Sequence, residues 1–187
     1  MSELSKFPSR FVSEQFVSYI SREEINELTT RLAAQISERY KGEELVLIGV
    51  LKGCSFFLSD LTKKLQDVKV YIDFMQLTHV GRSKESQGTI IIKKDITTNI
   101  LGRNVLIVEE IIDTGRALNF VKNRLLQSEA RSVEVVTLFD KPYGRAVPLI
   151  ANYIGKKIED QFIVGYGLDL EEYGRNIQDV YYLKYPN

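Results

Sequence analysis

The stretch that most constrains this chain is residues 104–118, which read NVLIVEEIIDTGRAL. Its apolar run, VLIV at residues 105–108, is rich in β-branched side chains and ends at charged ones. Such a run predicts a short strand buried on both faces, as in a parallel sheet covered by helices. Two carboxylates, Glu109 and Glu110, follow it, and then a turn leads into a helical pattern that reaches about residue 128. Open α/β sheets bind ligands where buried strands pass into helices, so this stretch predicts the functional edge of the protein.

The rest of the chain alternates between helical and strand patterns. Ser21 and Glu24 are spaced as a capping box, which predicts the start of a helix with apolar residues at helical spacing. We expect a second helix at residues 54–65 and strands at residues 45–51, 68–75, 89–93, 133–139, 151–154 and 162–164. This alternation predicts an α/β fold with a mostly parallel sheet and right-handed crossovers. The chain shows no repeat and no linker, so residues 1–187 are expected to form a single domain.

Composition restricts the class of partner. The chain has 25 Lys and Arg against 25 Asp and Glu, so no overall charge attracts nucleic acid or a membrane surface. The only cysteine, Cys54, excludes an intrachain disulfide, and we expect it to be a small buried group. The N-terminus does not read as a signal peptide, and no apolar run is long enough to cross a bilayer. We therefore expect a cytoplasmic protein.

Charged side chains follow several of the predicted strands. Lys52, Asp113 and Lys141 take this position, as Glu109 and Glu110 do. The carboxyl ends of parallel strands share one edge of a sheet, so these groups should gather along one rim.

The turn at residues 113–116, DTGR, suits a phosphate group. Free backbone N–H groups at a helix N-terminus bind phosphate, and Gly115 permits a close approach. The Thr114 hydroxyl and the Arg116 guanidinium add further donors. The alternative interpretation is a capped turn in which Asp113 or Thr114 serves only as the helix N-cap.

The adjacent carboxylates suit the two vicinal hydroxyls of a ribose, because each can accept a hydrogen bond. In a regular strand, however, Glu109 and Glu110 would point to opposite faces. Both can contact one ligand only if the strand has already ended. Asp113 would then lie between the sugar and phosphate sites, placed to accept a proton.

These residues carry a family resemblance. The segment IVEEIIDTGRAL resembles the phosphoribosyl-pyrophosphate (PRPP) loop of type I phosphoribosyltransferases, specifically the hypoxanthine-guanine group. LIGVLKGCSFFLSDL, LFDKP and DQFIVGYGLDLEEYGRN resemble the family's pyrophosphate, purine and closing segments, so the likeness covers most of the chain from about residue 45. It implies a mostly parallel twisted sheet flanked by helices, and a small hood formed by the N-terminal and C-terminal segments. It also implies a mobile lid, for which residues 76–88 read as a long surface loop.

The resemblance also implies a role for each matching residue. Ribose and 5′-phosphate would be bound by Glu109, Glu110, Asp113, Thr114, Gly115, Arg116 and Ala117, and Asp113 would also accept or orient the purine N7 proton. Pyrophosphate would be bound by Lys52, Gly53 and Arg175, where the family has a cis peptide between the residues matching Leu51 and Lys52. The purine would be bound by Lys141, Phe162, Ile163 and Asp169, and Mg²⁺ by Glu109, Glu110 and Asp169.

The resemblance implies a purine-salvage enzyme that converts hypoxanthine or guanine and PRPP to IMP or GMP and pyrophosphate, with Mg²⁺, as a homodimer or homotetramer. Three departures bear on its rate: Glu110 replaces the family's Asp, Ala117 replaces Thr or Ser, and residues 79–80 (His-Val) replace Ser-Tyr. One alternative is therefore a PRPP or nucleotide sensor with weakened catalysis. Another is an RNA-binding regulator like the pyrimidine attenuation proteins, which residues 152–157 (NYIGKK) slightly resemble. Neutral charge and the purine-type tail favour the enzyme.

Overall fold

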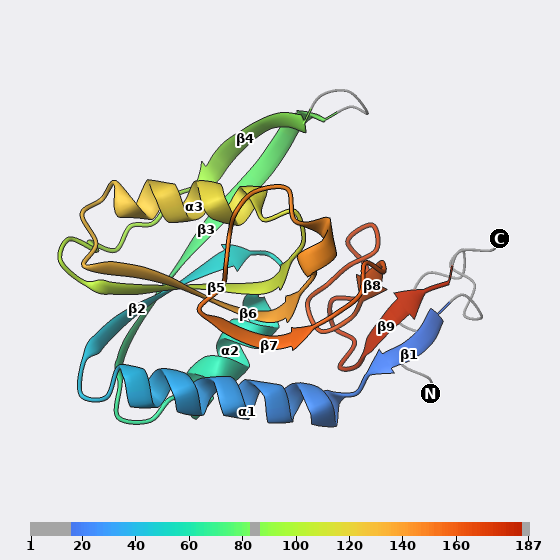
Figure 1. The fold of residues 1–187 in the computed structure, drawn as a ribbon, viewed down its shortest axis with the longest axis horizontal. Helices are drawn as coiled ribbons and strands as arrows, with labels where there is room; N and C mark the ends of the chain where they lie inside the picture. The colour runs from blue at the N-terminus through green and yellow to red at the C-terminus, as the bar shows by residue number, and fades with distance from the viewer. Residues whose placement is uncertain (1–15, 83–86, 185–187) are drawn as a thin grey trace.

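The computed structural model of the protein describes residues 16–82 and 87–184. Its elements, in chain order, are β1 (Phe16–Ile20), α1 (Arg22–Arg39), β2 (Glu44–Leu51), α2 (Ser55–Lys64), β3 (Lys69–Arg82), β4 (Gln87–Lys94), β5 (Asn104–Ile112), α3 (Arg116–Leu126), β6 (Ser132–Asp140), β7 (Tyr153–Lys157), β8 (Ile163–Val164) and β9 (Val180–Leu183) (Figure 1). The main sheet has the order β4-β3-β2-β5-β6-β7. All of its neighbouring strands are parallel except the β3–β4 pair, which confirms the predicted α/β fold.

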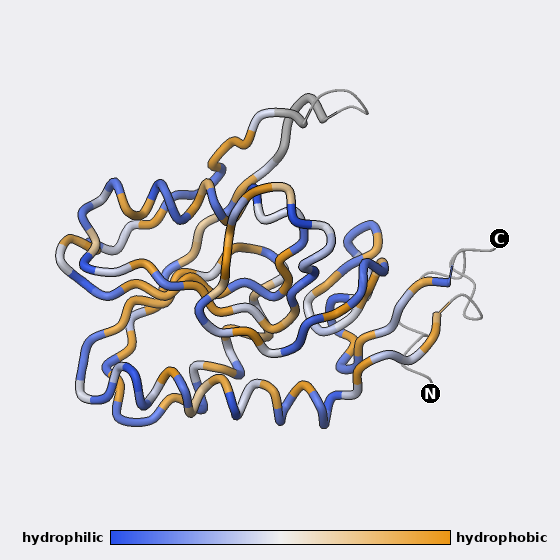
Figure 2. Tube along the Cα trace, viewed as in Figure 1, coloured by the Kyte–Doolittle hydropathy of each residue, from blue (hydrophilic) through white to orange (hydrophobic). Residues whose placement is uncertain are grey.

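Helices cover both faces of this sheet, with α1 and α2 on one face and α3 on the other (Figure 1). The alternation of side chains along β2 explains this arrangement. Leu45 and Leu47 pack in the core formed with α1 and α2, whereas Val46 and Ile48 pack in the core formed with α3. Hydrophobic residues accordingly concentrate in the central strands, and polar ones on the outer turns of the helices (Figure 2). A strand buried on both faces needs a continuous apolar run, as the sequence predicted.

A second sheet has the order β1-β9-β8 and lies beside the carboxyl end of β7 (Figure 1). It joins an N-terminal strand to two C-terminal strands, and β1 and β9 pair antiparallel. Ile20, Ile163 and Val180 from this sheet belong to the same core as α1 and α2. The small sheet is therefore packed onto the main one through shared apolar contacts.

Several local features agree with the prediction. Ser21 caps α1, because its Oγ accepts a hydrogen bond from the Glu24 amide at 3.2 Å. Cys54 is a free, buried thiol, and the peptide between Leu51 and Lys52 is cis. No helix within the described residues is both long and apolar enough to cross a membrane.

Three predictions of local structure were wrong. Residues 76–88 do not form one long loop, because β3 continues to Arg82 and β4 begins at Gln87; residues 83–86 of the expected lid lie outside the described residues. The reason is pairing with the apolar strand β4, in which Thr78 lies opposite Ile91. The second error is the position of β7, which spans Tyr153–Lys157 and not the expected 151–154. In addition, strands β1 and β9 were not predicted at all. The third error concerns β5 and is described with the site.

One buried carboxylate fixes the base of the β3–β4 hairpin. Asp73 on β3 is 7% exposed. It accepts hydrogen bonds from the amides of Phe74 (2.7 Å), Thr97 (2.6 Å) and Thr98 (2.8 Å) and from Lys94 Nζ (3.0 Å). Burial opposes ionisation, but these bonds outweigh it and hold the pKa of Asp73 well below its usual range. Asp73 thus ties the connection between β4 and β5 to β3.

Candidate active site

The carboxyl ends of three neighbouring strands, β2, β5 and β6, bring the predicted residues to one rim of the main sheet. Lys52 directly follows β2 and Lys141 directly follows β6, while Asp113 directly follows β5. The Lys141 amide donates to the Ile112 carbonyl at 2.9 Å, so the β5 and β6 ends are held together. Because these strands are parallel and in register, side chains far apart in sequence share this edge.

The turn after β5 forms a cradle of backbone groups at the start of α3. Gly115 is the N-cap of the helix, has a φ of 76°, and provides no side chain to cap the first turn. The amides of Ala117 and Leu118 are therefore free for a ligand, as the first amides of an uncapped helix are. Neither Asp113 nor Thr114 is the N-cap, although Thr114 Oγ1 accepts a hydrogen bond from the Arg116 amide at 3.5 Å, so the capped-turn alternative describes this turn only in part. A pocket of about 140 Å³ lies here, lined by Glu109, Ile111, Ile112, Asp113, Thr114, Gly115, Ala117 and Leu118.

The segment after β6 supports this cradle from behind. The Ala146 amide donates to the Thr114 carbonyl at 3.0 Å. Arg145 pairs with Asp140, and its Nη1 is buried without a hydrogen-bond partner in the described structure. A Cβ atom on Gly115 would lie only 3.1 Å from this Nη1. Arg145 thus places positive charge directly behind the turn. Our sequence analysis missed it, although it lies four residues after Lys141 in the same segment.

Glu109 and Glu110 do not lie beyond the strand, as a shared ligand was predicted to require. Strand β5 continues to Ile112 and pairs regularly with β6 on both sides of the two residues. Successive side chains of a strand alternate between faces, so the two carboxylates lie in different surroundings. Glu109 lines the 140 Å³ pocket. Burial raises the pKa of Glu109 to about 8, although a hydrogen bond from the Glu110 amide opposes the shift.

Glu110 is completely buried between backbone segments of the C-terminal loop and the Lys52–Gly53 turn. A Cβ on Gly53 would lie 2.7 Å from its Oε2, and one on Gly167 would lie 2.9 Å from the same atom. Neither carboxylate oxygen accepts a hydrogen bond within the described residues. The Leu168 amide lies close enough to favour the charged form, but it donates its bond to the Gly165 carbonyl. Burial and then the charge of Glu109 raise the pKa of Glu110 well above its usual value, despite Arg175.

A cluster of charged side chains includes Lys52 of the Lys52–Gly53 turn and residues of the C-terminal loop. Arg175 Nη1 donates to the Gly167 carbonyl at 2.8 Å, and its Nη2 lies 2.7 Å from Asp169 Oδ1. Lys52 Nζ and Arg175 Nη2 both contact Glu172 Oε2, at 2.9 Å and 3.2 Å. The structure therefore brings Lys52 and Arg175 together, as predicted from separate segments, and adds Asp169, which was assigned to the purine and to Mg²⁺. Our sequence analysis did not assign Glu172 a role, and a Glu-Glu pair in a turn gives little signal by itself.

The predicted purine residues lie at the junction with the small sheet. Lys141 is buried, donates through Nζ to the Gln161 carbonyl, and lies 3.7 Å from Asp160 Oδ1. Phe162 follows Gln161 directly and is 39% exposed, so its ring is available to a ligand. Ile163 is buried in β8. These contacts place Lys141 and Phe162 in one region, whereas Asp169 is held by Arg175.

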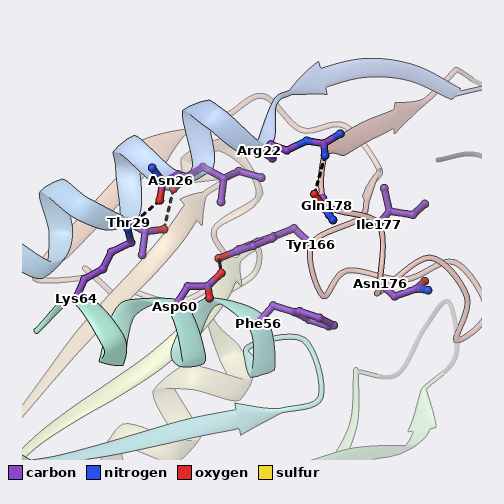
Figure 3. A pocket seen from close by; sticks show the side chains of 11 residues that line it. Arg22, Asn26, Thr29, Phe56, Asp60, Lys64, Tyr166, Asn176, Ile177 and Gln178 are labelled. Carbon is purple, nitrogen blue, oxygen red and sulfur yellow. Dashed lines mark hydrogen bonds between the residues drawn. The ribbon is translucent and has the colours of Figure 1, made fainter. Parts of the chain in front are cut away.

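A larger pocket lies elsewhere, between α1, α2 and the C-terminal loop (Figure 3). Its volume is about 350 Å³, and it contains none of the predicted site residues. Polar side chains that line it already pair with one another: Tyr166 donates to Asp60 at 2.9 Å, and Arg22 donates to Gln178 at 2.7 Å. This pocket is larger than the rim pocket, and pockets of this size commonly bind small ligands. The unpaired polar groups of the rim favour the smaller one as the functional site.

Comparisons with known proteins agree with this geometry. Residues 21–171 match the phosphoribosyl transferase domain family. The chain is 41% identical to the hypoxanthine-guanine phosphoribosyltransferase of Staphylococcus aureus over 165 residues, which covers 88% of this chain and 92% of the relative. The corresponding enzyme of Streptococcus pneumoniae is also 41% identical, with 88% and 91% covered.

Solved structures give the same result. The crystal structure of a Bacillus anthracis hypoxanthine-guanine phosphoribosyltransferase, with HEPES in its active site, superposes with a TM-score of 0.85 at 40% identity and covers 89% of this chain and 98% of its own. A Staphylococcus aureus hypoxanthine phosphoribosyltransferase gives 0.87 at 39% identity, with 93% and 96% covered. The predicted fold of a type I phosphoribosyltransferase is thereby confirmed. This chain belongs to the phosphoribosyl transferase domain family.

Proposed function

We propose that this protein transfers the phosphoribosyl group of PRPP to hypoxanthine or guanine, forming IMP or GMP and releasing pyrophosphate. The relatives named above carry this activity in their names. The observation that supports it best is the order of groups along one rim: a phosphate-binding turn, a pair of cations, and a buried lysine beside an exposed aromatic ring. These are the groups that a sugar phosphate, a diphosphate and a planar base require.

The turn at residues 113–117 would bind the 5′-phosphate. Its amides and the Thr114 hydroxyl provide donors around the pocket that Glu109 also lines, whereas Arg116 does not line this pocket. Ala117 provides only its amide, so the helix N-terminus and the charge of Arg145 would supply the attraction that a hydroxyl gives elsewhere. Glu109 would accept hydrogen bonds from the ribose hydroxyls.

Asp113 would accept or orient the proton on purine N7. Its side chain is exposed at the end of β5, and its Oδ1 lies where a Cβ on Gly144 would be only 2.6 Å away. The glycine therefore leaves this carboxylate room to face the site. Phe162 would stack on the base, Lys141 would donate to its 6-oxo group, and the Ile163 backbone would contact its edge.

Lys52 and Arg175 would bind the pyrophosphate group. As the bond to the anomeric carbon breaks, negative charge accumulates on the leaving group and positive charge on the ribose. Cations held at a fixed position stabilise the former without any reorganisation. The amide of Gly53 lies in the same turn. This part of the rim is therefore suited to stabilise the transition state.

We also propose Mg²⁺ as the metal. The described residues contain no group of three or more His, Cys, Asp or Glu side chains arranged to hold a metal. That arrangement fits Mg²⁺, which takes one or two carboxylates and substrate phosphate oxygens instead of a protein cage. Glu109, Glu110 and Asp169 are the carboxylates proposed to hold it. Glu110 has two oxygens without a hydrogen-bond partner in the described residues, whereas both oxygens of Asp169 already have partners. When bound, the metal would neutralise charge on the diphosphate.

A panel of bases tests this proposal. Purified protein, PRPP and Mg²⁺ are incubated separately with hypoxanthine, guanine, xanthine, adenine and uracil, and nucleotide formation is measured. We expect IMP or GMP to form and adenine to give no product, because Lys141 would donate to a 6-oxo group and adenine has a 6-amino group there. Uracil should give none because it lacks the purine N7 that Asp113 would contact. PRPP binding without product from any base would instead indicate a sensor. Retention of RNA on a filter would indicate the regulator, which the names of the relatives do not favour.

A further inference from the structure

One carboxylate joins the two cations that are proposed to bind pyrophosphate. Glu172 Oε2 lies 2.9 Å from Lys52 Nζ and 3.2 Å from Arg175 Nη2. Lys52 follows β2, whereas Arg175 lies in the loop before β9, so a single oxygen bridges segments that are far apart in sequence. This is the arrangement in which an external diphosphate oxygen would be held.

The backbone adopts an unfavourable conformation at Glu172. Leu170 and Tyr173 exchange two backbone hydrogen bonds of 3.0 Å, which makes Glu171 and Glu172 the central residues of a tight turn. Both have positive φ, 51° and 71°. Turns of this kind favour Gly, Asn or Asp at these positions, because left-handed backbone is unfavourable for other side chains. Strained positions of this type persist mainly where the surroundings or the function require them.

The two acids beside Arg175 are held differently. Asp169 contacts Arg175 through Oδ1 at 2.7 Å and accepts the Glu172 amide through Oδ2 at 2.8 Å, so both of its oxygens are anchored. The side chain of Glu172 is 63% exposed, against 30% for that of Asp169. Among the described residues, only the two cations contact its carboxylate end. Exposed ion pairs of this sort are weak and easily exchanged. Glu172 is therefore the acid whose carboxylate an incoming anion can displace from the two cations.

We propose that Glu172 is an internal competitor for the pyrophosphate site. This inference rests on the proposed function. In the ligand-free protein its carboxylate occupies the anion position between Lys52 and Arg175. The diphosphate of PRPP carries more negative charge and displaces it. When pyrophosphate is the product, Glu172 returns to the cations and so favours release. The competition lowers the apparent affinity for both diphosphates and leaves the affinity for the base unchanged.

The test measures binding of pyrophosphate and PRPP by calorimetry, and the KM values for PRPP and for the base. We expect Glu172→Gln to lower both dissociation constants and the PRPP KM about threefold to tenfold, with no change in the base KM. A role in folding alone would not separate the two KM values. Glu172→Gly provides a second variant, since glycine removes the carboxylate and tolerates the positive φ. Glu38→Gln, at an exposed position on α1, is the control for net charge and should change nothing.

A companion variant separates this inference from the proposed function. Lys52→Met should weaken pyrophosphate binding if Lys52 holds that group. If Lys52→Met leaves the affinity unchanged, the proposed site is wrong and the inference falls with it. If Lys52→Met weakens binding but the two Glu172 variants leave it unchanged or also weaken it, the site stands and the competitor role is refuted.

Discussion

Two of the carboxylates buried among the described residues, Asp73 and Glu110, have opposite surroundings. Asp73, at the base of the β3–β4 hairpin, is 7% exposed and accepts hydrogen bonds from three backbone amides and a lysine. Glu110, on β5, is 0% exposed, and neither of its oxygens accepts a hydrogen bond within the described residues. A buried carboxylate without partners costs free energy, so folding alone does not explain Glu110.

The contrast separates a structural region from the candidate active site. At the base of the hairpin, neighbouring residues donate all the hydrogen bonds that Asp73 requires, so no ligand is needed there. The rim leaves polar groups unsatisfied, including the Glu110 oxygens and Arg145 Nη1. Unsatisfied groups in a native site are places where a ligand or ion provides the missing partner. Substitutions in the two regions should therefore affect different properties, and the following predictions test this division.

Asp113→Asn gives the largest expected effect. If Asp113 exchanges the N7 proton, turnover should fall about 10²- to 10⁴-fold, the usual contribution of general acid–base catalysis. PRPP affinity should change far less, and stability should stay the same because the side chain is exposed. Steady-state kinetics, PRPP calorimetry and thermal unfolding provide the three measurements. Comparable losses in turnover and PRPP affinity would argue against the role as base.

Asp73→Asn should show the opposite pattern. Loss of hydrogen bonds to a charged, buried acceptor should lower the free energy of unfolding by roughly 2–4 kcal/mol, measured by urea unfolding at pH 7. Activity per folded molecule should be retained. Asp95→Asn is the matched control: Asp95 lies in the same connection, 2.8 Å from Arg124 in a more exposed ion pair. Asp95→Asn should lower the free energy of unfolding by about 1 kcal/mol or less. A drop in turnover without a drop in stability would place Asp73 in the functional class.

The acid dependence of stability gives a further test of Asp73. Its pKa is lowered in the folded state, so its stabilising contribution is fully present above the unfolded pKa of about 4 and is lost as the pH falls below it. Asp73→Asn should therefore flatten the decline in unfolding free energy between about pH 4 and pH 2. Urea unfolding at a series of acid pH values measures this slope. An unchanged slope would mean that other carboxylates control acid unfolding.

Much of the fold and of the candidate site could be predicted from the sequence, but not all of it. Apolar runs such as residues 105–108 predicted the buried strands, because a strand covered on both faces must be apolar throughout. The DTGR turn was predicted because its chemistry is local. Strand β9 was missed because its partner, β1, lies at the other end of the chain. The contact of Glu172 with Lys52 was missed for the same reason, since it spans 120 residues. The extent of β5 was underestimated because two glutamates do not mark a buried strand.

Glu110→Gln should change stability little, although the residue is completely buried, and it is the strictest test of the comparison. The substitution keeps the shape of the side chain and removes an ionisable group that no described hydrogen bond supports. Its free energy of unfolding should stay within about 1 kcal/mol of the original protein, or rise, because no bond to a charged acceptor is lost. Turnover should nevertheless fall at least about tenfold if this carboxylate contributes to ribose or Mg²⁺ binding. Urea unfolding and steady-state kinetics on the same preparation, beside Asp73→Asn, make the measurement. A stability loss as large as that of Asp73→Asn would show that Glu110 has structural partners, and the distinction between the two acids would then fail.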